Sequence, residues 1–268
     1  MNTLRVLYFG DVVGRHGRLA VTKALQEWKE ELAPDLICAN VENLAHGFGI
    51  TESTIRELEA AGVHIMTSGN HIYDNDAGVQ FLRDKNPKNV IKPANYHEST
   101  PGARFATRTV KGAPVLVVNL LGQTFMPEEV ASPFETVKDI VDTFASSETI
   151  VIIDLHAEAT GEKYAMKYFI EGKASLLVGT HTHIVTADEH ISTGGLGFIC
   201  DIGFSGAADS SLGMDAQRVL HKVVYNQPVH LEPPQEASRI VARAVVCDID
   251  IATKKAVRIA RVDRTYNV

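Results

Sequence analysis

The sequence has few cysteines, and their spacing argues against thiolate chemistry. Cys38, Cys200 and Cys247 are the only three in 268 residues, and no two of them form a CxxC pair. Nothing therefore indicates a zinc site built from thiolates or a redox pair. All three lie within or at the end of apolar runs of β type, so we expect buried, unreactive thiols.

Long apolar segments and clusters of basic residues are also missing. No run approaches the ~18 apolar residues of a membrane span, and no basic region followed by a long apolar segment opens the chain. We therefore expect a cytoplasmic protein with no membrane partner. The net charge is −7, from 26 basic and 33 acidic residues, and no basic cluster suggests a surface for duplex nucleic acid. A compact anionic substrate would need local positive charge, such as a metal.

The rest of the composition is ordinary for a globular protein. Hydrophobic residues make up 45% and charged residues 22% of the chain, whose length allows a sizeable core. There is no internal repeat, linker or low-complexity tract. We therefore predict a single domain over residues 1–268.

Apolar runs of β type alternate with helical patterns at both ends of the chain. Strands are predicted at 5–9, 35–41, 63–67, 149–155 and 174–178, with hairpins at 104–110 with 113–120, at 191–201 and at 239–250 with 256–262. Helices are predicted at 19–32, 51–61, 75–83, 133–145, 162–170 and 215–225, the second capped by Thr51. This order indicates an α/β protein with a mixed sheet, or two packed sheets, and helices outside.

Residues of the types that bind metals follow five separate predicted strands. In open parallel sheets, ligands bind outside the carboxyl ends of the strands, so we expect these side chains to meet at one rim. His181 and His183 stand two positions apart on backbone that we expect to be extended, which would point both imidazoles to the same face. The full set is Asp11; Glu42 and Asn43; Asn70 and His71; His156; and His181 with His183.

Each member of this set also has an ordinary structural interpretation. Asp11 could cap the helix after the first strand, and Asn70 could form the turn after Gly69. Glu42 could simply be solvated, and Asn43 could only position it, because amides are weak ligands. The histidine pair could lie in the core or on the surface. The functional interpretation therefore depends on the combination.

The chemistry of the combined set favours two metal ions. It offers two carboxylates, two carboxamides and four imidazoles, which suit Mn, Fe or Zn. Eight groups exceed what one ion usually takes, so we predict two ions bridged by a carboxylate and a hydroxide. Two divalent ions, two carboxylates and a hydroxide leave roughly one positive charge, which suits in-line displacement at a phosphate ester.

The order of these motifs resembles that of calcineurin-like metallophosphoesterases. The matching segments are 10–11 (Gly-Asp), 69–71 (Gly-Asn-His), a lone His156 and 179–183 (Gly-Thr-His-Thr-His). The usual GDxH is here Gly-Asp-Val-Val, and Val-Glu-Asn at 41–43 replaces GDxxD. These departures, with Glu-Asn-Leu-Ala-His-Gly-Phe-Gly-Ile at 42–50, are similar to the YmdB-like bacterial branch. The resemblance covers most of the chain.

This resemblance implies a four-layer αββα fold of two packed mixed sheets flanked by helices. It also implies a di-metal phosphodiesterase acting on 2′,3′-cyclic nucleotides such as 2′,3′-cAMP, with His71 protonating the leaving oxygen. The expected cofactors are two divalent or mixed-valence ions, Fe or Mn, with Zn as an alternative, and homo-oligomerisation stays open. The implied ligands are Asp11, Asn43 and His183 for one ion, Asn70, His156 and His181 for the other, and Glu42 as the bridge.

Other activities are weighed on the same residues. His156-Ala157-Glu158 resembles the HxE of zinc deaminases, but no PCxxC follows. The pair His181-x-His183 resembles that of amidohydrolase barrels, where it follows the first strand rather than a late one. The remaining alternatives are a phosphomonoesterase, a 3′,5′-cyclic or nuclease activity on the same metals, and a regulatory protein that binds a nucleotide without turnover.

Two glycine-containing segments and several histidines are less informative. Segment 14–18 (Gly-Arg-His-Gly-Arg) could help to bind phosphate through backbone N–H groups and guanidinium, or could be a surface turn. The Gly/Ala/Ser-rich segment 203–213 is predicted to be a loop, either mobile over the site or a plain connection. Histidines outside the set, among them His16 and His46, lack a clear pairing and are predicted to be structural or exposed.

Overall fold

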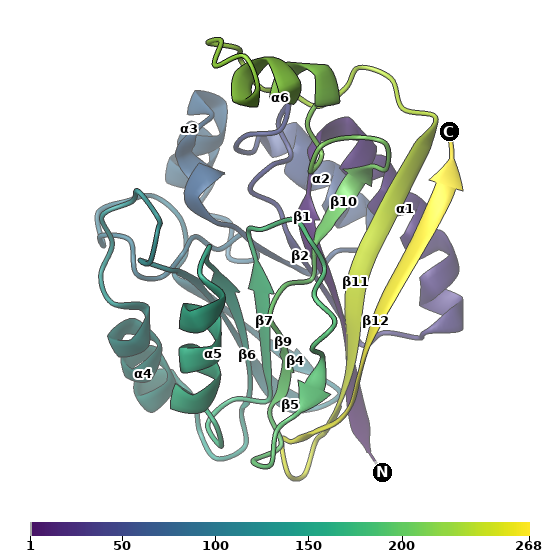
Figure 1. The fold of residues 1–268 in the computed structure, drawn as a ribbon. Coiled ribbons are helices and arrows are strands. Elements are labelled where there is room, and N and C mark those ends of the chain that lie inside the picture. The colour runs from purple at the N-terminus through teal and green to yellow at the C-terminus, as the bar shows by residue number, and fades with distance from the viewer. Residues whose placement is uncertain (1) are drawn as a thin grey trace.

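Two six-stranded mixed sheets, with helices on their outer faces, make up the computed structural model, which describes residues 2–268 (Figure 1). The first sheet has the order β12-β11-β10-β1-β2-β3, and β1, β2 and β3 run parallel. Its strands are β1 (Thr3–Val12), β2 (Leu36–Asn40), β3 (Ile65–Thr67), β10 (Phe204–Ala207), β11 (Arg239–Asp250) and β12 (Ala256–Asn267).

The second sheet has the order β4-β5-β6-β7-β9-β8. Its four central strands run parallel, and the edge strands β4 and β8 pair antiparallel. Its strands are β4 (Phe105–Val110), β5 (Ala113–Leu121), β6 (Ile150–His156), β7 (Leu176–Thr180), β8 (His190–Ile191) and β9 (Gly197–Ile199). The predicted hairpins at 104–120, 191–201 and 239–262 are therefore confirmed, although the last continues to Asn267.

Helices α4 and α5 cover the outer face of the second sheet and α1 that of the first, on opposite sides of the molecule, whereas α6 lies at the top of the view and buries no residue (Figure 1). The helices are α1 (Gly14–Glu31), α2 (Glu52–Ala61), α3 (Asp76–Lys85), α4 (Pro133–Phe144), α5 (Thr160–Phe169) and α6 (Ala216–Val223), with a short 3₁₀ helix η1 (Asn70–Tyr73). None of the helices among residues 2–268 has the length and apolar character that a bilayer crossing needs.

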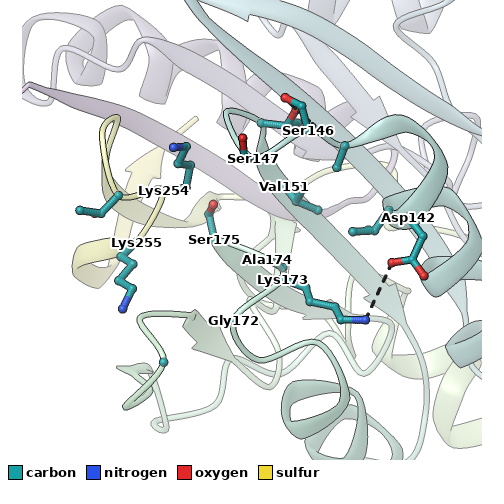
Figure 2. Close-up of a pocket in the computed structure, with 15 residues that line it drawn as sticks. Asp142, Ser146, Ser147, Val151, Gly172, Lys173, Ala174, Ser175, Lys254 and Lys255 are labelled. Carbon is teal, nitrogen blue, oxygen red and sulfur yellow. Dashed lines mark hydrogen bonds and ion pairs between the residues drawn. The ribbon is translucent and has the colours of Figure 1, made fainter.

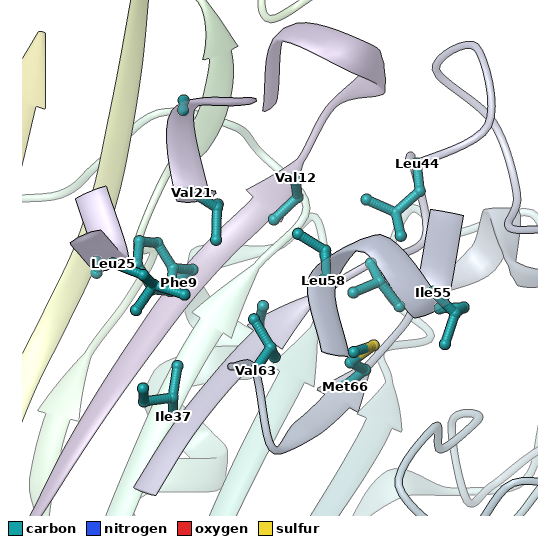
Figure 3. Packing of buried hydrophobic residues seen from close by; sticks show 14 of the residues in the cluster. Phe9, Val12, Val21, Leu25, Ile37, Leu44, Ile55, Leu58, Val63 and Met66 are labelled. Atoms are coloured by element: carbon teal, nitrogen blue, oxygen red, sulfur yellow. The ribbon is translucent and has the colours of Figure 1, made fainter. Parts of the chain in front are cut away.

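The alternation of side chains along each strand builds the layers. On β1, Tyr8 is buried between the sheets, whereas its neighbour Phe9 faces α1 and stacks on Trp28 at 5.6 Å between ring centroids. On β5, Val117 faces the layer between the sheets and Val118 faces the layer under α4 and α5. Because successive side chains point to opposite faces, strands buried on both sides are apolar almost throughout. Figure 3 shows the outer layer of the first sheet.

The predicted N-cap of α2 is confirmed, with a threonine in place of the usual glutamate. The Thr51 hydroxyl accepts from the Thr54 N–H at 3.3 Å, and the Thr54 hydroxyl accepts from the Thr51 N–H at 3.0 Å. Both ends of the capping box are therefore satisfied, and removing such a cap typically costs about 1 kcal/mol.

Two predictions about glycine-containing segments are wrong. Residues 204–207 are not loop but β10, a buried strand parallel to β1 and antiparallel to β11. The helix α1 begins at Gly14, five residues before the predicted start at 19. A Cβ at Gly17 would lie closer than 3.0 Å to the Ser205 carbonyl oxygen, so α1 and β10 approach closely and require small residues. Small residues are also typical of loops, which explains the wrong prediction for residues 204–207.

The three thiols are buried and free, as predicted. Burial raises the pKa of Cys38 and Cys247, and raises that of Cys200 to about 11. Little thiolate forms at neutral pH, which fits an unreactive role.

Candidate metal centre

The predicted site residues meet at the carboxyl ends of strands from both sheets. Asp11 lies near the end of β1, Glu42 and Asn43 follow β2, and η1 after β3 carries Asn70 and His71. From the second sheet, His156 ends β6, and the two remaining histidines follow β7. The meeting of five parallel strand ends explains why residues so far apart in sequence come together.

His156 is the centre of one group of ligand atoms. Its Nε2 lies 3.1 Å from Glu42 Oε1, 3.1 Å from Asn70 Oδ1 and 3.1 Å from His181 Nδ1. Donor atoms of Glu42, His156 and His181 all lie within 4.8 Å of one another. Carboxylate and imidazole donors this close together can bind one transition metal ion.

Asp11 connects this group to His183. The buried Asp11 carboxylate accepts from the His181 N–H through Oδ2 at 3.1 Å. Its Oδ1 lies 3.7 Å from His156 Nδ1 and 3.9 Å from His183 Nε2. The other nitrogen of His183, Nδ1, lies 2.7 Å from the Leu212 carbonyl oxygen. This contact directs His183 Nε2 toward Asp11.

Two buried oxygen atoms at this rim lack a hydrogen-bond partner among residues 2–268. They are Asp11 Oδ1 and Asn43 Oδ1. The Asn43 amide nitrogen donates to the Gly47 carbonyl at 2.9 Å, which fixes the orientation of the side chain. A buried polar atom without a partner costs about 1–3 kcal/mol, and a cation would satisfy both oxygens. The residues present therefore fit a second metal position.

The electrostatics of the metal-free centre reflect burial and mutual attraction. Burial raises the pKa of Asp11 to about 6. Burial alone would also raise the pKa of Glu42, but the charge and hydrogen bond of His156 lower it to about 2. Burial alone would lower the pKa of His156, but Glu42 raises it to about 9. Burial and the neighbouring His156 lower the pKa of His181 to about 3, so this imidazole is neutral and can bind a metal.

The backbone of the histidine pair is not extended, which corrects the prediction. The strand β7 ends at Thr180, and His181 and His183 have φ values of 98° and 63°. Left-handed conformations at such residues cost of order 1–3 kcal/mol each and require support from surrounding structure. The two imidazoles therefore reach the centre through a strained turn, not through strand alternation.

Asp201 supplies part of this support, and the sequence did not indicate it. Its carboxylate accepts from the Thr182 N–H at 3.1 Å and from the Thr182 hydroxyl at 2.8 Å. The same carboxylate pairs with the buried Lys163 of α5 at 2.9 Å. Lys163 also donates to the Thr180 carbonyl at 2.8 Å. A buried ion pair therefore holds both ends of the turn.

A second buried network orients His156. The Thr180 hydroxyl lies 2.9 Å from His156 Nδ1 and donates to Asp154 Oδ1 at 2.8 Å. The Thr67 hydroxyl donates to Asp154 Oδ2 at 2.5 Å, and Asn40 lies within 3.3 Å of the same oxygen. Burial raises the pKa of Asp154. A single carboxylate in the apolar run 149–155 was the signal that could have found this network.

The backbone of His71 contacts a proposed metal ligand, Glu42, whereas its imidazole ring contacts Asp74. Its backbone N–H donates to Glu42 Oε2 at 2.8 Å, and its Nδ1 lies 2.7 Å from Asp74 Oδ2. Its ring meets Phe48 edge to face at 4.8 Å between centroids. The Nε2 atom has no hydrogen-bond partner among residues 2–268. Asp74, which the sequence prediction missed, stands three residues after His71 on the turn of η1.

A cavity lies at the amino ends of strands β6 and β7, opposite the ends that carry the predicted site residues. It has a volume of about 540 Å³ and is lined by the start of β6, by Ser175 before β7 and by Lys254 and Lys255 of the last hairpin (Figure 2). None of the predicted site residues lines it. It is therefore separate from the rim where the ligand-type residues meet.

Comparisons with known proteins agree over nearly the whole chain. A sequence model of the YmdB-like protein family matches residues 7–262. The 2′,3′-cyclic-nucleotide 2′-phosphodiesterase of Bacillus subtilis strain 168 is 38% identical, over 97% of this chain and 96% of that protein. A crystal structure described as a novel phosphatase from Mycoplasma pneumoniae has a TM-score of 0.92 and 27% identity, covering 100% of this chain and 95% of that one. The crystal structure of a hypothetical protein from Thermus thermophilus has a TM-score of 0.90 and 29% identity, with 98% and 99% covered.

Proposed function

The chain belongs to the YmdB-like protein family, and from this membership we propose that it is a di-metal phosphodiesterase of 2′,3′-cyclic nucleotides. The broader class, a hydrolase acting on phosphoric ester bonds, follows from the phosphodiesterase and the phosphatase among its relatives. The substrate class is that for which the Bacillus subtilis relative is named, the 2′,3′-cyclic nucleotides.

One observation supports the metal pair most strongly. Asp11 Oδ1 and Asn43 Oδ1 are buried without a partner among residues 2–268, beside the cluster of Glu42, His156 and His181 donors. A centre for one ion would account for the cluster and leave the two orphan oxygens unexplained. We assign Asp11, Asn43 and His183 to one ion, Asn70, His156 and His181 to the other, and Glu42 to a position between them.

Ions bound there would activate water and neutralise the charge that develops on the phosphate. The oxygen and nitrogen donors suit Fe or Mn, with Zn as the alternative. Asp201 and Asp154, through the networks described above, hold the histidines in position. We also propose that residues 1–268 act as one domain, since the centre draws ligands from both sheets.

His71 is assigned the role of general acid. Water loses one proton to the solvent as it adds to phosphorus, the ring P–O bond breaks, and His71 delivers a proton from Nε2 to the ribose oxygen that leaves. Asp74 Oδ2 lies 2.7 Å from the other nitrogen, Nδ1, and fixes the orientation of the ring. A positioned histidine contributes about 10²–10⁴-fold in rate.

The test combines elemental analysis of the purified protein with a substrate screen. We expect about two metal equivalents per chain, and higher kcat/KM for 2′,3′-cyclic nucleotides than for 3′,5′-cyclic nucleotides, a linear diester or a phosphomonoester. Preference for the monoester would instead favour the phosphatase activity for which the Mycoplasma pneumoniae relative is named. No hydrolysis of any ester by metal-loaded protein would reject the proposal.

The role of His71 is tested with a matched histidine variant. His71→Ala should lower kcat by about 10²-fold or more while metal content stays unchanged. The control is His97→Ala, which removes an exposed ring whose Nδ1 contacts Ser99 at 2.8 Å, and which should leave kcat unchanged. Full turnover by His71→Ala would refute the assignment of the acid. A cellular effect that survives in His71→Ala would indicate a nucleotide-binding role that does not need turnover.

A further inference from the structure

A pocket at the start of α1 is lined by residues that lie close in sequence to the proposed metal ligands. It has a volume of about 340 Å³, and Arg15, His16, His46 and Glu232 are among the residues that line it. Gly14, which also lines it, stands three residues after Asp11. The Gly14 N–H donates to the Asn43 carbonyl at 2.9 Å. The walls of the pocket are thus continuous with two of the segments that carry the proposed metal ligands.

His16 borders this pocket without a partner. Its side chain is buried, with 6% of the residue exposed, yet its ring makes no hydrogen bond among residues 2–268. Its two ring nitrogens are not fully enclosed, and the residue lines the pocket, so the ring can be reached from there. A buried polar ring without a partner is costly unless a ligand or water satisfies it.

The pocket is also electropositive. Arg15 is exposed and forms no ion pair among the described residues, and no side chain caps the N-terminus of the 18-residue helix α1. The first turn of α1 contains no acidic residue, so the positive end of the helix dipole is not compensated there. Glu232 is the acidic residue that lines the pocket, and it pairs with Arg218 at 2.6 Å. Its charge is therefore already balanced.

We propose that this pocket binds a second phosphate of the substrate, the phosphate carried on the ribose 5′ oxygen. This inference rests on the proposed function, in which the 2′,3′-cyclic phosphate of the same nucleotide occupies the metal centre. The two phosphates of one nucleotide would then be bound by the same two segments, 11–16 and 42–46, which carry proposed metal ligands as well as residues that line the pocket. Arg15 supplies a guanidinium, and His16 and the start of α1 supply N–H donors.

Such a phosphate has two sources with the same local chemistry. It could be the terminal 5′-phosphate of a mononucleotide, or the diester that links the last nucleotide of an RNA fragment to its predecessor. The substrates that separate them are adenosine 5′-phosphate 2′,3′-cyclic phosphate and a diadenosine dinucleotide with a terminal 2′,3′-cyclic phosphate. The reference is 2′,3′-cAMP, which carries a free 5′ hydroxyl.

The experiment compares kcat/KM for each phosphorylated substrate with that for 2′,3′-cAMP. In the wild type we expect a preference of about tenfold for at least one of them, the size expected for a charge-assisted hydrogen bond. Arg15→Gln should reduce this preference to near unity. Arg83→Gln, which removes an exposed arginine of α3 without an ion pair among residues 2–268, should keep it. A gain limited to the dinucleotide would identify an RNA end, and a gain limited to the mononucleotide would identify a free nucleotide.

The same ratio in Arg15→Gln as in the wild type would overturn the proposal, as would no preference in the wild type. Calorimetry with metal-loaded His71→Ala protein measures affinities for the same ligands without turnover. If the enzyme hydrolysed no cyclic substrate, the proposed function would fail. The Arg15-dependent difference in affinity between ligands with and without the 5′-phosphate would still decide whether the pocket exists as described.

Discussion

Replacing Gly69 with alanine should empty the metal centre without unfolding the protein. A Cβ at this position would lie closer than 3.0 Å to the His156 imidazole and to Glu42 Oε2, a separation that real Cβ atoms essentially never show. Ordinary contact begins at 3.4 Å, so each separation would have to grow by about 1 Å. Both side chains are buried.

The size of this displacement sets the expected loss. Functional groups must be held within about 0.5 Å of their working geometry, and a shift of about 1 Å can cost about 10²-fold in rate. We expect Gly69→Ala to lower kcat/KM by about 10²-fold and to reduce metal content. Overpacking of this kind costs about 1–3 kcal/mol in stability, which a domain of this size tolerates.

The assay measures metal content, kcat/KM on 2′,3′-cAMP and the free energy of unfolding for each protein. Gly161→Ala is the matched control, because a Cβ at Gly161 in α5 meets nothing within 4 Å. This control should keep full activity and gain about 0.5–1 kcal/mol, since alanine replaces glycine in a helix. Wild-type metal content and activity in Gly69→Ala would refute the idea that the backbone at 69 packs against the ligands.

Three further predictions concern charge. Lys163→Met leaves Asp201 buried without its partner, so denaturant unfolding should show a loss of about 3–5 kcal/mol; an unchanged midpoint would contradict the buried pair. Burial raises the pKa of Asp11 from 3.8 to about 6 in the metal-free protein, so its contribution to stability is lost as the pH rises through that value. Asp11→Asn should therefore stabilise the metal-free protein above this pH by up to ~3 kcal/mol, as measured by unfolding, while its metal content falls. The affinity of the metal-free protein for Mn²⁺ should rise with pH between about 6 and about 9. The reason is that a metal can bind only after protons have left Asp11, whose pKa is about 6, and His156, whose pKa is about 9. Affinities that calorimetry finds to be independent of pH would contradict this.

The site residues could be predicted because strand order in a parallel sheet limits where strand ends lie. Asp11, Glu42 and His156 each follow a recognisable apolar run, so their meeting follows from topology without knowledge of any single contact. The supporting residues could not be predicted in this way. Asp201 and Lys163 are joined by a contact between separate segments that no sequence pattern records.

Local backbone geometry was harder still to predict. Side chains two residues apart on a strand share a face, which suggested that His181 and His183 lie on the same side of an extended chain. In the structure both residues have positive φ values, and this turn is supported by the contact of Thr182 with Asp201. The strand β10 was missed for a related reason. Its small residues serve the close approach of α1, and short runs of glycine, alanine and serine are typical of loops as well.

The most direct test of the central claim is anomalous diffraction from crystals of the protein grown with Mn²⁺. We predict two peaks, one beside Asp11, Asn43 and His183 and the other beside Asn70, His156 and His181, with Glu42 between them. A single peak, or two peaks away from these side chains, would contradict the assignment of a metal pair to this rim.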